Sequence, residues 1–71
     1  GGIPGKVLSK VDDPGDLYLV ELYPDGKDEP AGDTVTVQQL QITTTDTIPA
    51  DTWAIVIQHG ETYSMQVAVW V

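Results

Sequence analysis

The last twenty residues of the chain have a two-residue hydrophobic period on both sides of a glycine turn. One alternating run begins at Trp53 and ends at His59, and after Gly60 a second run begins at Tyr63 and continues to Val71. A period of two is that of a β-strand, whose successive side chains point to opposite faces of the sheet. The pattern predicts a β-hairpin over residues 52–71.

Three further segments have the composition of strands. Residues 17–23 are rich in β-branched, leucine and tyrosine side chains and end at the turn-forming Pro24-Asp25-Gly26. Residues 34–37 alternate polar and apolar side chains, and a β-bulge at Gln38-Gln39 would bring the following Leu40 and Ile42 onto the same face. Residues 6–11 form a weaker strand, which we expect at a sheet edge.

These segments predict an all-β fold without helices, a small antiparallel barrel or curled sheet of about five strands. The short connections favour antiparallel neighbours throughout, and closure into a barrel is the simplest way for so few strands to pair both edges. We expect one small β domain over residues 7–71, preceded by a flexible amino-terminal arm over residues 1–6.

The strand face on which each aromatic residue lies predicts whether that residue is buried. Trp53 shares a face with Ile55 and Ile57, which predicts a core position. Tyr18 and Tyr23 have opposite parity on one strand, so both are buried only if both faces of that strand are covered.

The charge balance excludes one class of ligand. Eleven acidic residues against three lysines give a net charge of −8, which opposes binding to nucleic acid because such a surface must neutralise phosphates. The chain has no cysteine, and no apolar run approaches the ~20 residues of a membrane-spanning helix. We therefore expect neither a nucleic acid nor a membrane partner.

No catalytic, cofactor-binding or metal-binding pattern is present in the sequence. His59 stands alone at the hairpin turn, and neither acidic cluster, at residues 12–16 or 25–29, has the spacing of a calcium-binding EF-hand loop. The prediction is a binding or structural protein without cofactors rather than an enzyme.

Four residues are candidates for a protein interface. Ile3 and Pro4 form a short apolar segment in the expected arm, which could pack against a neighbouring surface. Tyr63 and Trp70 lie on the last strand, and Trp70 shares its face with polar neighbours. Two interpretations of Trp70 stay open: it closes one end of the barrel, or it is exposed as an interface anchor or a sugar platform.

Several short motifs occur in a fixed order along the chain: Gly2-Ile3-Pro4, Asp13-Pro14-Gly15, Asp25-Gly26, Val35-Thr36-Val37, and Ile48-Pro49-Ala50-Asp51-Thr52-Trp53. Together they resemble a small β domain of tailed-bacteriophage structural proteins, over nearly the whole chain. Two positions depart from the family pattern: Gly5 stands where the family has alanine, and Asp51 stands where it has glycine.

The resemblance implies a virion component of small β-barrel type without catalytic residues. Our leading hypothesis is a capsid decoration, or cement, protein that binds the major capsid protein or another virion protein and stabilises the lattice. We also expect self-association, with a trimer as the first candidate. The alternative is a tail or fibre module that binds host surface glycan or another tail protein.

Overall fold

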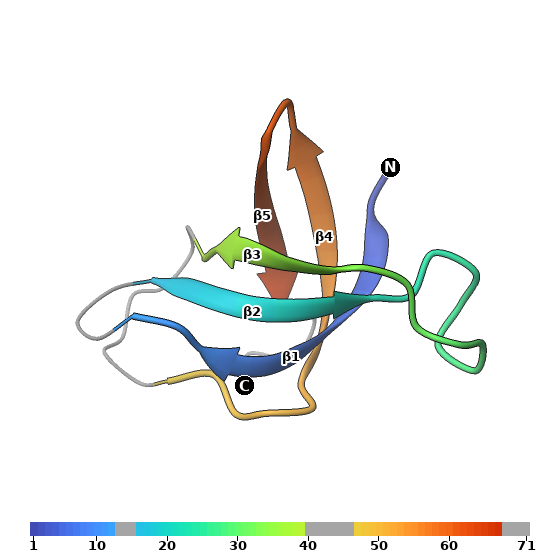
Figure 1. Ribbon diagram of the computed structural model, residues 1–71, viewed down its shortest axis with the longest axis horizontal. Coiled ribbons are helices and arrows are strands. Elements are labelled where there is room, and N and C mark those ends of the chain that lie inside the picture. The colour runs from blue at the N-terminus through green and yellow to red at the C-terminus, as the bar shows by residue number, and fades with distance from the viewer. Residues whose placement is uncertain (13–15, 40–46, 68–71) are drawn as a thin grey trace.

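The computed structural model describes residues 1–12, 16–39 and 47–67, which form five strands and no helix (Figure 1). The strands are β1 (Ile3–Lys10), β2 (Leu17–Leu22), β3 (Thr34–Gln38), β4 (Trp53–His59) and β5 (Thr62–Val67). They pair in the order β1-β2-β3-β5-β4, and β4 pairs again with β1. The predicted small five-stranded barrel is confirmed. In the described ranges no helix is long and apolar enough to cross a membrane.

One pair of neighbours is parallel, which corrects the expectation of antiparallel pairing throughout. β3 and β5 run in the same direction, whereas the other four neighbouring pairs are antiparallel. Strand directions can alternate around a closed ring only when the number of strands is even. A closed ring of five strands must therefore contain at least one parallel pair.

The expected flexible arm over residues 1–6 is instead part of β1 from Ile3 onward. The register with β4 runs from Ile3 opposite Val56 to Lys6 opposite Trp53. On its other side β1 pairs with β2, so it is an interior strand of the ring rather than the predicted edge strand. The arm prediction was wrong because barrel closure gives this apolar segment two partners, which no local sequence signal shows.

The described residues place a β-bulge in β1. The pairing of β1 with β2 shifts between Val7 and Ser9. β3 ends at Gln38, and the bulge expected at Gln38-Gln39 stays a prediction because Leu40 and Ile42, which it would bring onto one face, lie outside the described residues.

The hairpin prediction is confirmed over residues 53–67. β4 and β5 pair continuously from Ala54 opposite Val67 to His59 opposite Thr62. Gly60 turns the chain with φ of 65°, a conformation that glycine adopts without steric cost. Residues 68–71, the predicted end of the hairpin, lie outside the described residues.

The inward face of β4 is the one with the smaller side chains. Ala54 and Val56 are buried, whereas Trp53 is half-buried on the outside and Ile55 is 38% exposed. The prediction that Trp53 lies in the core was therefore wrong. Tyr18, Ile48 and Met65 fill the narrow interior, so β4 contributes small residues to it.

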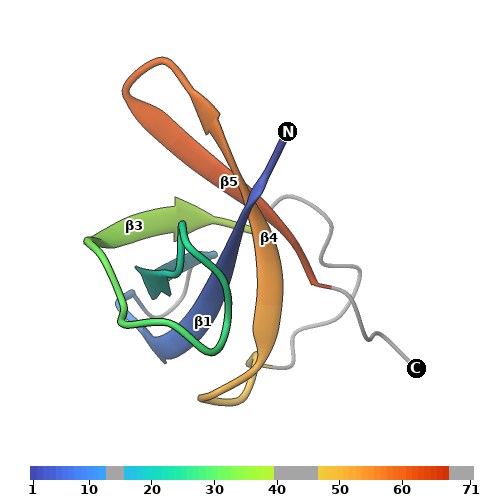
Figure 2. The ribbon, with the colours of Figure 1, turned by 90° about the vertical axis from the view of Figure 1, so that its right-hand side faces the viewer.

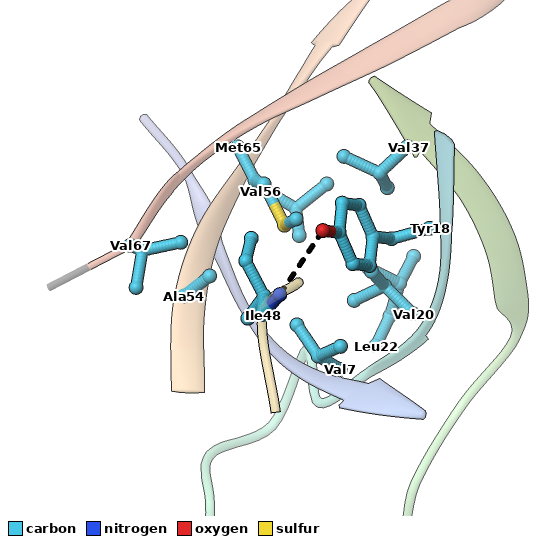
Figure 3. Close-up of a cluster of buried hydrophobic side chains, with 10 residues drawn as sticks. All are labelled: Val7, Tyr18, Val20, Leu22, Val37, Ile48, Ala54, Val56, Met65 and Val67. Atoms are coloured by element: carbon cyan, nitrogen blue, oxygen red, sulfur yellow. Dashed lines mark hydrogen bonds between the residues drawn. The ribbon is translucent and has the colours of Figure 1, made fainter. Parts of the chain in front are cut away.

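The core draws on every strand and on the connection between β3 and β4 (Figure 3). From that connection, Ile48 reaches into the core, and its backbone N–H donates a 3.0 Å hydrogen bond to the buried hydroxyl of Tyr18. This bond joins residues thirty positions apart. The buried apolar residues in contact are Val7, Tyr18, Val20, Leu22, Val37, Ile48, Ala54, Val56, Met65 and Val67.

Candidate functional site

The outer face of the barrel carries a cluster of aromatic and charged side chains over β1, β2 and β4. Lys6 is opposite Glu21 on one side and opposite Trp53 on the other. Paired residues point to the same face of a sheet, so these three side chains lie in a row on the outside. We call this group, with Tyr23 and Lys27, the aromatic–lysine cluster.

Tyr23 is held firmly against this row. Its ring meets that of Trp53 edge to face, with 4.9 Å between the centroids and 65° between the planes. Its hydroxyl donates a 2.6 Å hydrogen bond to Oε1 of Glu21, and its backbone N–H donates to the carbonyl of Pro4. Tyr23 is only 8% exposed, although it does not belong to the interior core. Both tyrosines of opposite parity, Tyr18 and Tyr23, are thus buried, one on each face.

Two of the three lysines of the chain lie over these rings. Nζ of Lys6 is 5.4 Å from the centroid of Tyr23 and 5.7 Å from that of Trp53. Nζ of Lys27 is 5.0 Å from the centroid of Trp53. A cation this close to a ring face is attracted by the ring quadrupole. An acidic protein therefore concentrates its positive charge on one aromatic surface.

The cluster raises the pKa of Lys6 above its ordinary value of 10.5. The largest cause is a hydrogen bond with the Tyr23 side chain, followed by attraction to the charge of that side chain when it is ionised. Asp51 and Glu21 act in the same direction, and partial desolvation opposes them. The protonated form of Lys6 is therefore the one that the folded protein favours.

A pH titration tests this arrangement. Because the folded-state pKa is raised, the contribution of Lys6 to stability is complete below pH 10.5 and is lost as the pH rises through the folded pKa. In Tyr23→Phe, which removes the largest cause, we expect the pKa of Lys6 to fall toward its ordinary value. NMR titration of the lysine side-chain Cε signals measures both values. An unchanged Lys6 pKa in Tyr23→Phe contradicts the proposed contact.

The structure places three of the four sequence-predicted interface residues. Ile3 and Tyr63 are half-buried and pack against the core from β1 and β5. They approach the same end of the barrel, since Ile3 is opposite Val56, which is opposite Met65, two residues from Tyr63. Pro4 adjoins the aromatic–lysine cluster through its carbonyl. Trp70 lies outside the described residues.

Sequence reasoning missed the aromatic–lysine cluster because it placed Trp53 inside. The alternative was visible: on the other face of the same strand, Ala54 and Val56 offer a smaller apolar pair. The opposite parity of Tyr23 and Tyr18 also indicated that one tyrosine must find cover on the outside. No sequence signal, however, pairs Lys6 with Trp53, because that neighbourhood depends on closure of the barrel.

A second polar contact lies on the hairpin. Nε2 of His59 is 2.7 Å from Oγ of Ser64, a distance compatible with a base and a nucleophile. The contact is exposed, so water has free access to it. Among the described residues, no group of three or more His, Asp or Glu side chains is arranged to hold a metal ion.

Comparisons of the chain with protein-family models, with curated proteins and with solved structures find no match. The geometry of the surfaces and the order of the sequence motifs are therefore the basis for a functional proposal.

Proposed function

We propose that this chain is a structural protein of a tailed-bacteriophage particle, a capsid decoration protein that binds the coat-protein lattice. The observation that carries the proposal is the aromatic–lysine cluster, in which a half-buried tryptophan on the outside of the barrel packs against the buried Tyr23 and lies beneath two lysines. Tryptophan is among the residues that most often dominate protein interfaces, because it buries a large area with little loss of conformational freedom. The lattice repeats this contact, and self-association, with a trimer as first candidate, would reinforce it.

Two further features support this proposal. The interior of the barrel is filled by side chains such as Tyr18 and Met65, which leaves the surface to bind partners. Asp51 has φ of 68°, in the left-handed region that glycine adopts most readily, and it stands where the phage family pattern has glycine. A glycine at this position, as in the family pattern, would adopt this backbone conformation without strain.

The lysines favour a protein partner over the alternative glycan ligand of a tail or fibre module. A sugar that stacks on a tryptophan needs an open ring face, and Nζ of Lys27 lies over the ring of Trp53. A coat protein can instead place a carboxylate beside Lys6 and Lys27, which does not require an open ring face.

Removal of the central ring tests the proposal. Trp53→Ala is expected to weaken binding to purified particles that lack this protein by about 30-fold, which corresponds to the ~2 kcal/mol of an interface hot spot. Cosedimentation with the particles measures binding, and circular dichroism verifies the fold. His59→Ala, at the other end of the same strand, is the matched control and should bind normally. Equal binding by Trp53→Ala and the parent protein refutes the role of the cluster.

Lys27→Ala separates the two functions. It uncovers the ring of Trp53, so a glycan ligand would bind more tightly, whereas a coat protein that offers carboxylates would bind less tightly.

Mass spectrometry of the particles gives the copy number, and only a few copies per particle would exclude a role over the whole lattice.

A further inference from the structure

The barrel is closed most weakly where β3 meets β5. Within the described ranges a single register pair, Gln38 with Ser64, joins these strands, whereas six pairs join β4 to β5. From this pair the two strands diverge toward their first residues, so that the hairpin leans away from β3 (Figure 2). We call the region between residues 34–37 and residues 62–64 the seam.

The backbone of β3 presents polar groups to the seam. Two hydrogen bonds show which residues of β3 direct their backbone groups toward β2. The N–H of Leu22 donates to the carbonyl of Asp33, and the N–H of Gln39 donates to the carbonyl of Asp16, so the odd-numbered residues of this segment bond to β2. In an antiparallel ladder, backbone groups point to the partner strand at every second residue. Those of Val35 and Val37 therefore face β2, and those of Thr34 and Thr36 face the seam. Both threonines are exposed.

Apolar side chains lie along the inner side of the same region. Val35 and Tyr63 are half-buried and pack against the core from the two strands that border the seam, and Ile3 does so from β1. An added strand with apolar residues at every second position would cover Val35 and Tyr63 with one face and leave its other face in water.

The charges around the seam favour a basic occupant. Native proteins often protect open strand edges with lysine or proline, but residues 34–37 and 62–64 include neither. An exposed acidic residue directly precedes each of the two strands, Asp33 before β3 and Glu61 before β5. Because the strands are parallel, these two carboxylates lie at the same, open end of the seam.

We propose that the seam binds a short extended segment of a partner protein as an additional β-strand. The segment hydrogen-bonds to Thr34 and Thr36, places small apolar side chains against Val35 and Tyr63, and carries a lysine or arginine between Asp33 and Glu61. A second copy of this chain fits poorly, because each copy has a net charge of −8 and would bring more carboxylates to the same end. This surface differs from the aromatic–lysine cluster, and the inference does not depend on the proposed virion role.

A designed peptide tests the inference directly. The probe is the blocked peptide Lys-Thr-Val-Thr-Val-Thr-Lys, added to the isotope-labelled protein and followed by NMR. We expect shifts at residues 34–37 and 62–64, and hydrogen exchange of the Thr34 and Thr36 amides slowed by about tenfold or more. Absence of any shift at millimolar peptide, or shifts confined to the aromatic–lysine cluster, overturns the proposal.

Backbone-modified peptides identify the mode of binding. One control peptide carries N-methyl groups on the backbone nitrogens of its valines, and the other carries them on those of its threonines. Each control therefore lacks the backbone N–H donors along one edge of the extended peptide. At least one of them must lose binding, since an added strand needs its backbone donors. Equal binding of both controls and the parent peptide overturns the proposal without any change to the protein.

Thr36→Pro is the matching change in the protein. It removes an N–H that faces the seam but no hydrogen bond to β2, so the barrel should persist while peptide binding falls by at least about tenfold. Thr36→Val is the control and should bind the peptide normally. Unchanged peptide binding by Thr36→Pro overturns the proposal. The proposal is also overturned if the parent protein forms a dimer that Thr36→Pro dissociates, because the seam would then bind a second copy of this chain.

A charge test completes the series. The double variant Asp33→Asn, Glu61→Gln is expected to weaken binding of the lysine peptide by about three- to fivefold at low salt, with the effect reduced at high salt. A peptide with glutamate in place of lysine should bind the parent protein more weakly than the lysine peptide. Equal affinity for both peptides contradicts the basic occupant.

Discussion

Ile48→Ala is expected to lower the free energy of unfolding by about 2–5 kcal/mol, the usual cost of removing a large buried aliphatic side chain. Ile48 is 2% exposed and packs among core residues from the strands (Figure 3). A domain of this size has a total stability of roughly 4–11 kcal/mol. The variant should therefore lose a large fraction of its stability, which urea denaturation followed by tryptophan fluorescence measures.

A matched deletion on the outside provides the control. Ile55→Ala removes the same atoms from a side chain that is 38% exposed, and it should cost much less. Tyr18→Phe tests the polar part of the same contact, because it leaves the Ile48 N–H without its hydroxyl acceptor, at a cost of about 1–3 kcal/mol. Equal losses in Ile48→Ala and Ile55→Ala would contradict the burial of Ile48 in the core.

Gly5→Ala is expected to destabilise the barrel by about 1–3 kcal/mol through overpacking. A Cβ at Gly5 would lie 2.7 Å from Cγ1 of Val20 and 2.7 Å from Cγ2 of Val56, closer than carbon atoms approach one another. Both valines are buried in the core, so neither can move aside freely. Thermal denaturation of the variant measures the loss.

Two variants make this result specific. Gly1→Ala adds the same methyl group where nothing lies within 4 Å, and it should leave the stability unchanged. Val56→Ala makes room beside Gly5, so the double variant Gly5→Ala, Val56→Ala should be more stable than the sum of the two single losses predicts. Strict additivity would show that the added methyl group does not meet Val56.

Gly5 and Ile48 both reflect how the interior of a barrel of five short strands is filled. Gly5 lets β1 pass close to the side chains of Val20 and Val56, and Ile48 enters from the connection between β3 and β4. The close approach at Gly5 is possible because glycine has no side chain, and the space beside Tyr18 is filled by Ile48, which belongs to no strand. Small barrels have little interior volume, so both adjustments have large effects on stability.

Part of the surface that we propose to bind partners contains residues chosen from the sequence. Ile3, Pro4 and Tyr63 were chosen as interface candidates, and the structure places Ile3 and Tyr63 at the end of the barrel where the seam opens. The aromatic–lysine cluster was not predicted, because its members come from β1, β2, β4 and the connection between β2 and β3. Their proximity results from pairings across the sheet, which local patterns do not encode.

The amino-acid sequence by itself determined the strand character of the chain and its final hairpin. A period of two, and turn residues such as Gly60, act over a few neighbouring residues, so they can be recognised without the rest of the molecule. The tertiary structure decided which face of each strand turns inward, where Trp53 lies, and how the ring closes. The interior accepts only a certain volume, so Ala54 and Val56 face inward and Trp53 faces outward. Five strands cannot alternate in direction around a closed ring, and the resulting parallel seam between β3 and β5 is a property of the whole barrel rather than of any segment.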